Sequence, residues 1–347
     1  MAIPFAEKNV PSQRLDSIQL ARFMAAFLVV LTHASFYVSS RISPGVDIWR
    51  SGAQGVNVFF VISGFVMMLS ADPLLGKPGA FRHFAAARII RIVPLYWTLN
   101  LLKIALVIFI PSMAFAAPTI SNVIFSMLFL PSRNAQGLIE TFYGVGWTLN
   151  FEMFFYVLVG LALLWKRPIL PFAAPILLIM AALSVARTDT WPAITDLFRP
   201  ILLNFLWGMI IAHFYSINMR MPFFIALGSV SSSLAIILFL PDVFLFELPF
   251  ALLIAGMVSL EPFLKGRVPR WAIWGGDASY SLYLVHPMAG VVTAIVLQRL
   301  HVNSMPLAFL VIVAACLAAS AATFMLVERP MTQALLQRFR RPLPGPS

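Results

Sequence analysis

The chain has 347 residues, of which 61% are hydrophobic and only 11% are Asp, Glu, Lys or Arg. Soluble globular domains carry roughly a quarter charged residues, so this composition excludes a water-soluble protein of this size. In a soluble protein, the formal charge of +11 would indicate an acidic partner such as nucleic acid. In a membrane protein, Lys and Arg of cytoplasmic loops explain the same excess. We therefore expect a lipid bilayer around the chain and no nucleic-acid partner.

Apolar runs of about 18 to 22 residues recur along the chain between polar breaks, and a helix of that length crosses roughly 30 Å of hydrocarbon. We predict an all-α, polytopic membrane protein with ten transmembrane segments: 19–38, 52–70, 93–111, 145–165, 168–186, 198–215, 221–240, 244–260, 278–298 and 305–327. The stretch 119–131 is too short to span and is expected to be a re-entrant or interfacial piece.

Basic residues indicate the orientation of these segments, because Lys and Arg collect in cytoplasmic loops. An even number of segments with both termini in the cytoplasm places most of the 24 basic residues inside. The expected location is a bacterial inner membrane. We expect one transmembrane domain over residues 1–347, with a core at about 14–330, a cytoplasmic tail at 331–347 and no attached soluble domain. Glu328, followed by an Arg-Pro pair, is expected to close the last helix.

Ionisable side chains inside the predicted segments are costly in hydrocarbon and are therefore functional candidates. Arg22 lies at the cytoplasmic end of the first segment, and His33 follows eleven residues later. Eleven helical steps of about 100° place both side chains on one face, about 16 Å apart along the axis. A buried His is neutral at low cost and can act as a base near pH 7. Membrane-interface anchoring is the alternative interpretation for Arg22 alone.

The fourth segment begins with a polar run, from Trp147 to Glu152. This segment runs from outside to inside, which places Glu152 about 10 Å below the outer boundary, at a depth similar to that of His33. A carboxylate and an imidazole at one depth can form an orienting pair or a base–acid pair. Tyr156 lies one turn further on the same face and is a weaker candidate.

Two arginines precede the third segment. Arg88 and Arg91 are three residues apart, so they share one helix face at the cytoplasmic surface. The guanidinium fork fits phosphate oxygens, which makes the pair a candidate phosphate site. Ordinary anchoring at the inner surface is the alternative, since any cytoplasmic loop of this protein is expected to be basic.

A polar stripe marks the ninth segment. Ser279, Tyr283 and His286 recur at spacings of four and three, which places them on one helix face. Pro287 removes a backbone donor and disfavours helix at His286, so it can kink the helix and free a carbonyl. A polar stripe beside a helix break is typical of the lining of an internal channel. Helix packing alone is the other interpretation.

Together these elements resemble the bacterial acyltransferase family 3, in particular its exopolysaccharide O-acetyltransferase branch. The resemblance covers roughly residues 14–330 and rests on five stretches in order: 15–33 with Arg22 and His33, 55–65 with Ser63, 88–91, 147–152 and 280–287. The second stretch departs from the family, which often has an acidic residue at the position of Asn57. We expect Asn57 to orient its neighbours by hydrogen bonding instead.

The resemblance implies transfer of an acyl group, acetyl in this branch, from acetyl-CoA or another acyl-CoA to a hydroxyl of a glycan or lipid-linked oligosaccharide. The phosphates of coenzyme A would lie on Arg22, Arg88 and Arg91. His33 would act as general base or accept the acyl group, and Glu152 would orient it or share its proton. We expect no permanently bound cofactor and no metal. The residues expected to line or support the channel are Asn57, Ser63, Trp147, Tyr156, Ser279, Tyr283 and His286.

Two other functional classes fit parts of the sequence. A proton-coupled transporter or flippase of a glycan precursor would use His33 and Glu152 as a proton relay. It leaves the paired arginines unexplained, and no internal repeat supports it. A non-catalytic subunit of a polysaccharide-export complex would leave the buried His and Glu without a role. Turnover of acyl-CoA distinguishes the acyltransferase hypothesis from both of these alternatives.

Overall fold

The computed structural model describes residues 14–110, 118–240 and 247–340. Over these ranges the chain forms helices and no strand. The α-helices are α1 Asp16–Tyr37, α2 Gly55–Ala71, α3 Ala80–Phe109, α4 Ile120–Met127, α5 Trp147–Leu164, α6 Ile169–Leu183, α7 Leu203–Ser216, α8 Phe223–Phe239, α9 Leu248–Ser259, α10 Glu261–Leu264, α11 Arg270–Asp277, α12 Ser279–Arg299, α13 Met305–Thr323 and α14 Arg329–Arg340. The all-α prediction is confirmed.

Six helical stretches of the described chain are long and apolar enough to cross a membrane: Asp16–Ile42, Ser51–Leu74, Ala80–Phe109, Gly144–Leu164, Ser279–Arg299 and Met305–Phe339. Each of them overlaps one of the ten predicted segments. Four shorter apolar helices, α6 to α9, overlap the other four predicted segments. A helix satisfies its backbone hydrogen bonds internally, which is why apolar segments in hydrocarbon adopt it.

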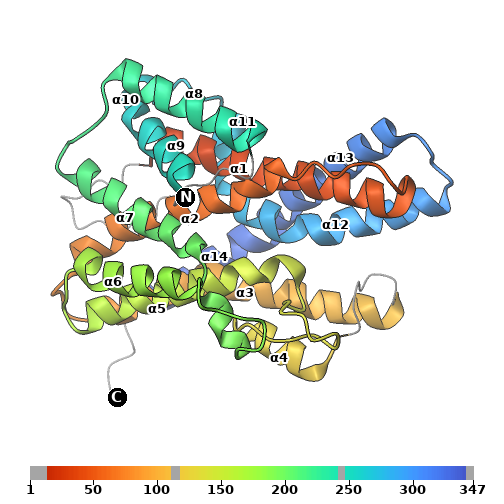
Figure 1. Cartoon of the computed structure of the whole chain (residues 1–347), viewed down its shortest axis with the longest axis horizontal. Coiled ribbons are helices and arrows are strands. Elements are labelled where there is room, and N and C mark those ends of the chain that lie inside the picture. The colour runs from red at the N-terminus through yellow and green to blue at the C-terminus, as the bar shows by residue number, and fades with distance from the viewer. Residues whose placement is uncertain (1–13, 111–117, 241–246, 341–347) are drawn as a thin grey trace.

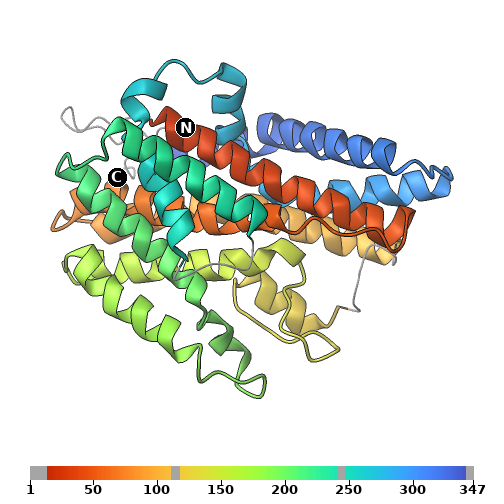
Figure 2. The ribbon, with the colours of Figure 1, turned by 45° about the horizontal axis from the view of Figure 1, so that its top comes forward.

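The long helices run roughly along the longest axis of the molecule, which is horizontal in Figures 1 and 2. Helix α1 packs against α2, α11 and α12, while α12 packs against α13. Helices α3 and α5 contact each other, and α8 pairs with α9. Two adjoining cores hold this arrangement together. One core lies mainly among α2, α3, α5 and α7, and the other lies among α1, α12 and α13.

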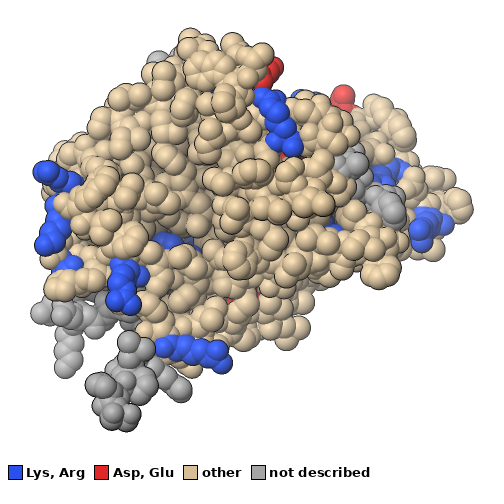
Figure 3. All heavy atoms as spheres, turned by 90° about the horizontal axis from the view of Figure 1, so that it is seen from below, with Lys and Arg blue, Asp and Glu red and all other residues tan. Residues whose placement is uncertain are grey.

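Large apolar side chains cover much of the outer surface. Phe109, Val185 and Phe224 are each more than four-fifths exposed, and many Leu and Ile side chains lie beside them. On the face seen in Figure 3, most of the surface carries no charged side chain, and the Lys and Arg side chains lie in small groups toward both the left and the right end of the view. An apolar surface of this extent needs lipid rather than water around it.

Helices α2 and α7 cross at backbone contact. A Cβ added at Gly64 of α2 would lie 2.2 Å from the carbonyl oxygen of Phe205, and one added at Gly208 of α7 would lie 2.1 Å from that of Val61. Only glycine permits this approach, as in other close-packed membrane helices. The crossing fixes α2, which supplies one wall of the pocket described below.

Three expectations about segment ends need correction or restriction. The third segment begins at Ala80 rather than at 93, so Arg88 and Arg91 lie within its helix rather than before it. The last helix does not stop at Glu328, because α14 continues it to Arg340 and occupies the expected tail from 331 on. Position 111, positions 244–246 and the tail positions 341–347 lie outside the described residues. The short helix α4 occupies most of the stretch 119–131.

Substituting either glycine at the α2–α7 crossing is expected to destabilise the protein. Gly64→Ala or Gly208→Ala forces the helices apart, and overpacking of this kind costs about 1–3 kcal/mol. Thermal unfolding in detergent measures the loss. Gly228→Ala is the matched control, because a Cβ on that helical glycine of α8 meets nothing within 4 Å. Equal melting temperatures for all three variants would show that the crossing does not limit stability.

Candidate active site

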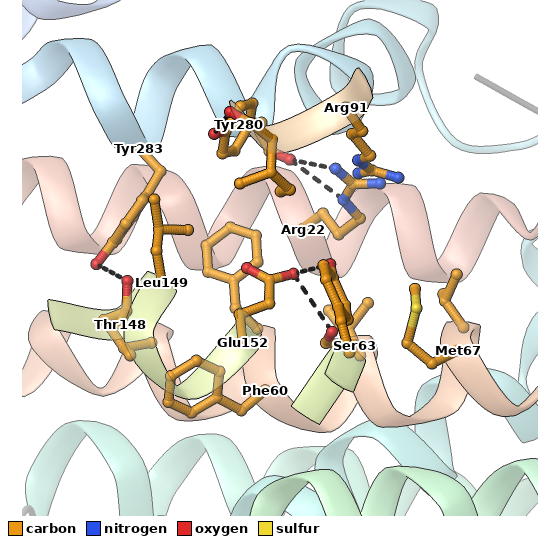
Figure 4. A pocket seen from close by; sticks show the side chains of 17 residues that line it. Arg22, Phe60, Ser63, Met67, Arg91, Thr148, Leu149, Glu152, Tyr280 and Tyr283 are labelled. Carbon is orange, nitrogen blue, oxygen red and sulfur yellow. Dashed lines mark hydrogen bonds between the residues drawn. The ribbon is translucent and has the colours of Figure 1, made fainter. Parts of the chain in front are cut away.

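A pocket inside the bundle collects many of the polar side chains of the long helices. Side chains of α1, α2, α3, α5 and α12 line it (Figure 4). Apolar residues such as Phe60 and Met67 form part of its wall, and the polar part consists of Arg22, Ser63, Arg91, Thr148, Glu152, Tyr156, Ser279, Tyr280 and Tyr283. Arginines and a carboxylate that meet among apolar helices make this pocket the main candidate site.

Arg22 and Arg91 lie together at one side of the pocket (Figure 4). Ser279 holds Arg22 there, because its Oγ accepts hydrogen bonds from Nε at 3.2 Å and from Nη2 at 2.9 Å. The arginines come from α1 and α3, so the fold brings two like charges from distant parts of the sequence to one place. Two guanidinium groups at one wall favour an anionic ligand.

Glu152 lies in the pocket between this arginine pair and Tyr283 (Figure 4). Its Oε1 accepts a short hydrogen bond from the hydroxyl of Tyr156 and a longer one, at 3.4 Å, from Ser63. Within the described chain its Oε2 has no hydrogen bond. The carboxylate is therefore fixed through one oxygen and offers the other to a ligand.

His33 and His286 form a pair of imidazoles from α1 and α12. Their ring centroids are 4.7 Å apart with an interplanar angle of 64°. Nδ1 of His33 lies 2.9 Å from the carbonyl oxygen of Val29, and Nδ1 of His286 lies 3.1 Å from that of Leu282. A carbonyl only accepts, so both Nδ1 atoms carry the proton and both Nε2 atoms keep a free lone pair. His286 is fully buried, and its Nε2 has no hydrogen-bond partner within the described chain.

The expected pairing of His33 with Glu152 does not occur in the structure. His33 does not line the pocket, and no hydrogen bond joins it to Glu152 among the described residues. Tyr283 instead lies between the pocket that holds Glu152 and the imidazole pair of His33 and His286. It lines the pocket, its hydroxyl lies 2.9 Å from Oγ1 of Thr148, and its ring lies 5.9 Å from the ring of His286. The imidazole pair is therefore adjacent to the pocket wall.

Helix α12 runs without interruption through Pro287, so the expected break at His286 is absent. Side chains of other segments bond the carbonyl groups of this part of α12. Tyr143 donates to Leu284, and Tyr37 donates to Pro287 at 3.1 Å. The buried Cys316 lies with its Sγ 3.4 Å from the carbonyl oxygen of His286. These contacts attach α12 to its neighbours, and the helix carries Ser279 and Tyr283 at the pocket.

The two arginines of α3 occupy different surroundings. Arg91 lines the pocket, whereas Arg88 does not line it and is only 4% exposed. Arg88 donates through Nη2 to Ser70 on α2, at 3.3 Å. The two expected phosphate ligands are therefore not equivalent in the folded chain.

Besides His286, two of the expected supporting residues, Asn57 and Trp147, do not line the pocket. Asn57 bonds Gln54 through Nδ2 at 2.6 Å and accepts from Asn204 of α7 at 3.2 Å. The bond with Asn204 joins α2 to α7. Trp147 packs edge-on against Phe151, with the guanidinium of an arginine 6.0 Å from its ring.

Glu328, expected from the sequence only to close the last helix, contacts α12 in the structure. It accepts a hydrogen bond from Ser281 of α12 and lies within electrostatic range of Arg22 and Arg91. It ends a π-helical turn, Phe324–Glu328, inside a continuous helix. Such turns are frequent at functional sites, but residue spacing does not announce them. Its only signal in the sequence is a carboxylate next to an apolar run.

The described residues contain no group of three His, Cys, Asp or Glu side chains that could hold a metal ion. The polar groups at the pocket and beside it are arginines, hydroxyls, a carboxylate and two imidazoles. This set is suited to binding an anion and to moving a proton.

Loss of the acceptor at position 152 is expected to destabilise the site. Glu152→Gln keeps an oxygen for Tyr156 and Ser63, whereas Glu152→Leu leaves both hydroxyls without it. A buried unsatisfied group costs about 1–3 kcal/mol, so the Leu variant should unfold at the lower temperature in detergent. Val157→Leu, a lipid-exposed position on the same helix, is the control. If the Gln and Leu variants melt together, these hydrogen bonds do not hold the site.

Comparison with known proteins agrees with this picture. The acyltransferase domain family matches residues 15–325, which include every helix that lines the pocket. The exopolysaccharide production protein ExoZ of Rhizobium meliloti (strain 1021) is 35% identical over 299 residues, covering 81% of this chain and 89% of that protein. No solved structure matches the chain. The chain therefore belongs to acyltransferase family 3 and is a multi-pass membrane acyltransferase.

Proposed function

We propose that this protein is an acyl-CoA-dependent O-acyltransferase that modifies a cell-surface or exported polysaccharide, or its lipid-linked precursor. The acyl group is acetyl. Membership of the family supports acyl transfer, and the name of the Rhizobium relative, an exopolysaccharide production protein, supports a polysaccharide acceptor. The choice of donor rests on the chemistry of the pocket.

One observation carries the proposal: Arg22, Arg91 and Glu152 share a pocket inside a bundle of apolar helices. Coenzyme A carries a pyrophosphate and a 3′-phosphate, and guanidinium groups bind phosphate oxygens with paired, charge-assisted hydrogen bonds. In the proposed complex the phosphates lie at Arg22 and Arg91, and the pantetheine arm extends past Glu152 toward Tyr283. The free Oε2 of Glu152 accepts a hydrogen bond from an amide of this arm.

His33 is the proposed general base, because its Nε2 lone pair is free while Nδ1 is held by the carbonyl of Val29. The acceptor hydroxyl oxygen attacks the thioester carbonyl carbon, and its proton passes to Nε2. The C–S bond then breaks, and the departing sulfur takes the proton from His33. The products are the O-acylated glycan and free coenzyme A, and His33 returns to its neutral form.

The proposal also includes an orientation. Ten segments, with both termini in the cytoplasm of a bacterium and the chain in its inner membrane, place the first turns of α1 on the inner side. Arg22 lies in this part of α1, so the donor reaches the pocket from the cytoplasm. The basic residues of the loops support this orientation.

Cysteine labelling tests the orientation. In a Cys316→Ala background, Lys265→Cys should react with a membrane-impermeant maleimide only after the inner membrane of cells is opened. Asp47→Cys, at the other end of the bundle, should react in spheroplasts that are still intact. Both positions are exposed in the structure. The reverse pattern would invert the orientation, and labelling of both positions from outside would contradict the proposed even number of crossings.

Transfer of label tests the activity. Purified protein in proteoliposomes, given acetyl-CoA labelled in the acetyl group and a lipid-linked oligosaccharide pool, should transfer label to the glycan. His33→Ala should lower the rate by about 100-fold or more, because general base catalysis contributes about 10²–10⁴-fold. His213→Ala, an exposed histidine of α7, should leave the rate unchanged.

Two results would contradict the proposal in different ways. If folded protein turns over no acyl-CoA although acceptor is present, the enzyme assignment fails, and glycan movement driven by a proton gradient becomes the next assay. If His33→Ala transfers label at the wild-type rate, the activity stands but the assignment of the base is wrong.

A further inference from the structure

Arg88 lies between aromatic rings rather than in the pocket. Its guanidinium carbon is 5.5 Å from the centroid of Phe84 and 6.0 Å from that of Tyr156. Nε and Nη1 have no hydrogen-bond partner within the described chain, and Nη2 donates to Ser70. A desolvated cation held over ring faces is stabilised by their quadrupoles, and Arg stacks on rings better than Lys does. The group is thus bound by the protein itself.

Tyr156 separates Arg88 from the pocket. Tyr156 lines the pocket, and Arg88 approaches its ring without lining the pocket itself. The hydroxyl of Tyr156 donates the short hydrogen bond to Oε1 of Glu152. A chain of direct contacts therefore runs from Arg88 through Tyr156 to the carboxylate. Its members come from α3 and α5, and Ser70 and Ser63 of α2 bond its two ends.

We propose that Arg88 is a positioning residue that fixes Tyr156, and through it the Glu152 carboxylate, while Arg22 and Arg91 alone recognise the phosphates of the donor. The inference rests on the proposed function. It divides the two arginines of α3, which are three residues apart, between two tasks. Arg91 contributes to donor affinity, and Arg88 contributes to the rate of the bound complex.

Donors with and without phosphates separate these tasks. Full-length protein in proteoliposomes is assayed with acetyl-CoA and with acetyl-pantetheine, which lacks the nucleotide and its phosphates. Arg91→Ala should raise KM for acetyl-CoA by about tenfold or more, as expected for loss of a charge-assisted phosphate contact, and leave the kinetics with acetyl-pantetheine unchanged. Arg88→Ala should instead lower kcat by about tenfold with both donors and change KM for acetyl-CoA by less than about threefold.

Tyr156→Phe provides the second arm, because it removes only the hydroxyl that bonds Glu152. It should lower kcat as Arg88→Ala does, and the double variant should be no slower than the slower single variant. Arg88→Lys, which retains the charge, should recover part of kcat. Arg88→Met, which fills similar space without a charge, should recover less of kcat than Arg88→Lys does. Arg82→Ala, an exposed arginine on the same helix, is the control and should match the wild type.

The inference is overturned if Arg88→Ala raises KM for acetyl-CoA as Arg91→Ala does, since Arg88 then binds phosphate. It is also overturned if the losses from Arg88→Ala and Tyr156→Phe multiply in the double variant. If Arg88→Ala does not fold, Arg88→Lys and Tyr156→Phe provide the same test. Each should lower kcat while changing KM for acetyl-CoA by less than about threefold, and a raised KM would overturn the inference. If the wild type transfers acetyl from neither acetyl-CoA nor acetyl-pantetheine, the proposed function itself is overturned, and the inference with it.

Discussion

The organisation of this protein follows from one constraint: a charged side chain surrounded by apolar helices has to find its partners within the protein. Arg22 is bonded by Ser279, Glu152 by Tyr156 and Ser63, and Arg88 by Ser70 and two ring faces. Each partner comes from a different turn or a different helix. The polar interior is therefore connected, and it links five helices at the pocket.

The sequence was sufficient for the coarse architecture. Apolar runs give the positions of the helices well, because their length and hydropathy are properties of the runs themselves. They give the ends poorly: α3 extends toward its N-terminus as far as Ala80, and the last helix continues past Glu328. There the helix continues through polar residues held by tertiary packing, which hydropathy cannot express.

The sequence predicted some of the residues that line the pocket, but not which side chains pair with each other. Arg22, Arg91, Glu152, Tyr283 and Ser279 do meet in one pocket, since ionisable groups in apolar segments converge on the interior. The partners are set by helix rotation and tilt, which residue spacing does not specify. The expected depths of the first and fourth segments suggested a His–Glu pair, whereas packing sets the two histidines against each other. The rotation of α3 likewise places Arg91 in the pocket and Arg88 against the rings of Phe84 and Tyr156.

The glycine crossing of α2 and α7 has a mechanical consequence. At Gly64 and Gly208 the backbones of α2 and α7 are in contact, with no layer of side chains between them. The two helices therefore cannot slide past each other and are expected to move as one rigid unit. This unit contributes Ser63 and Met67 of α2 to the pocket wall. Whatever widens the pocket to admit a bulky donor therefore displaces α2 and α7 together, or moves the opposite side, formed by α1, α3, α5 and α12. Helix α2 cannot change its position in the pocket wall without carrying α7 with it.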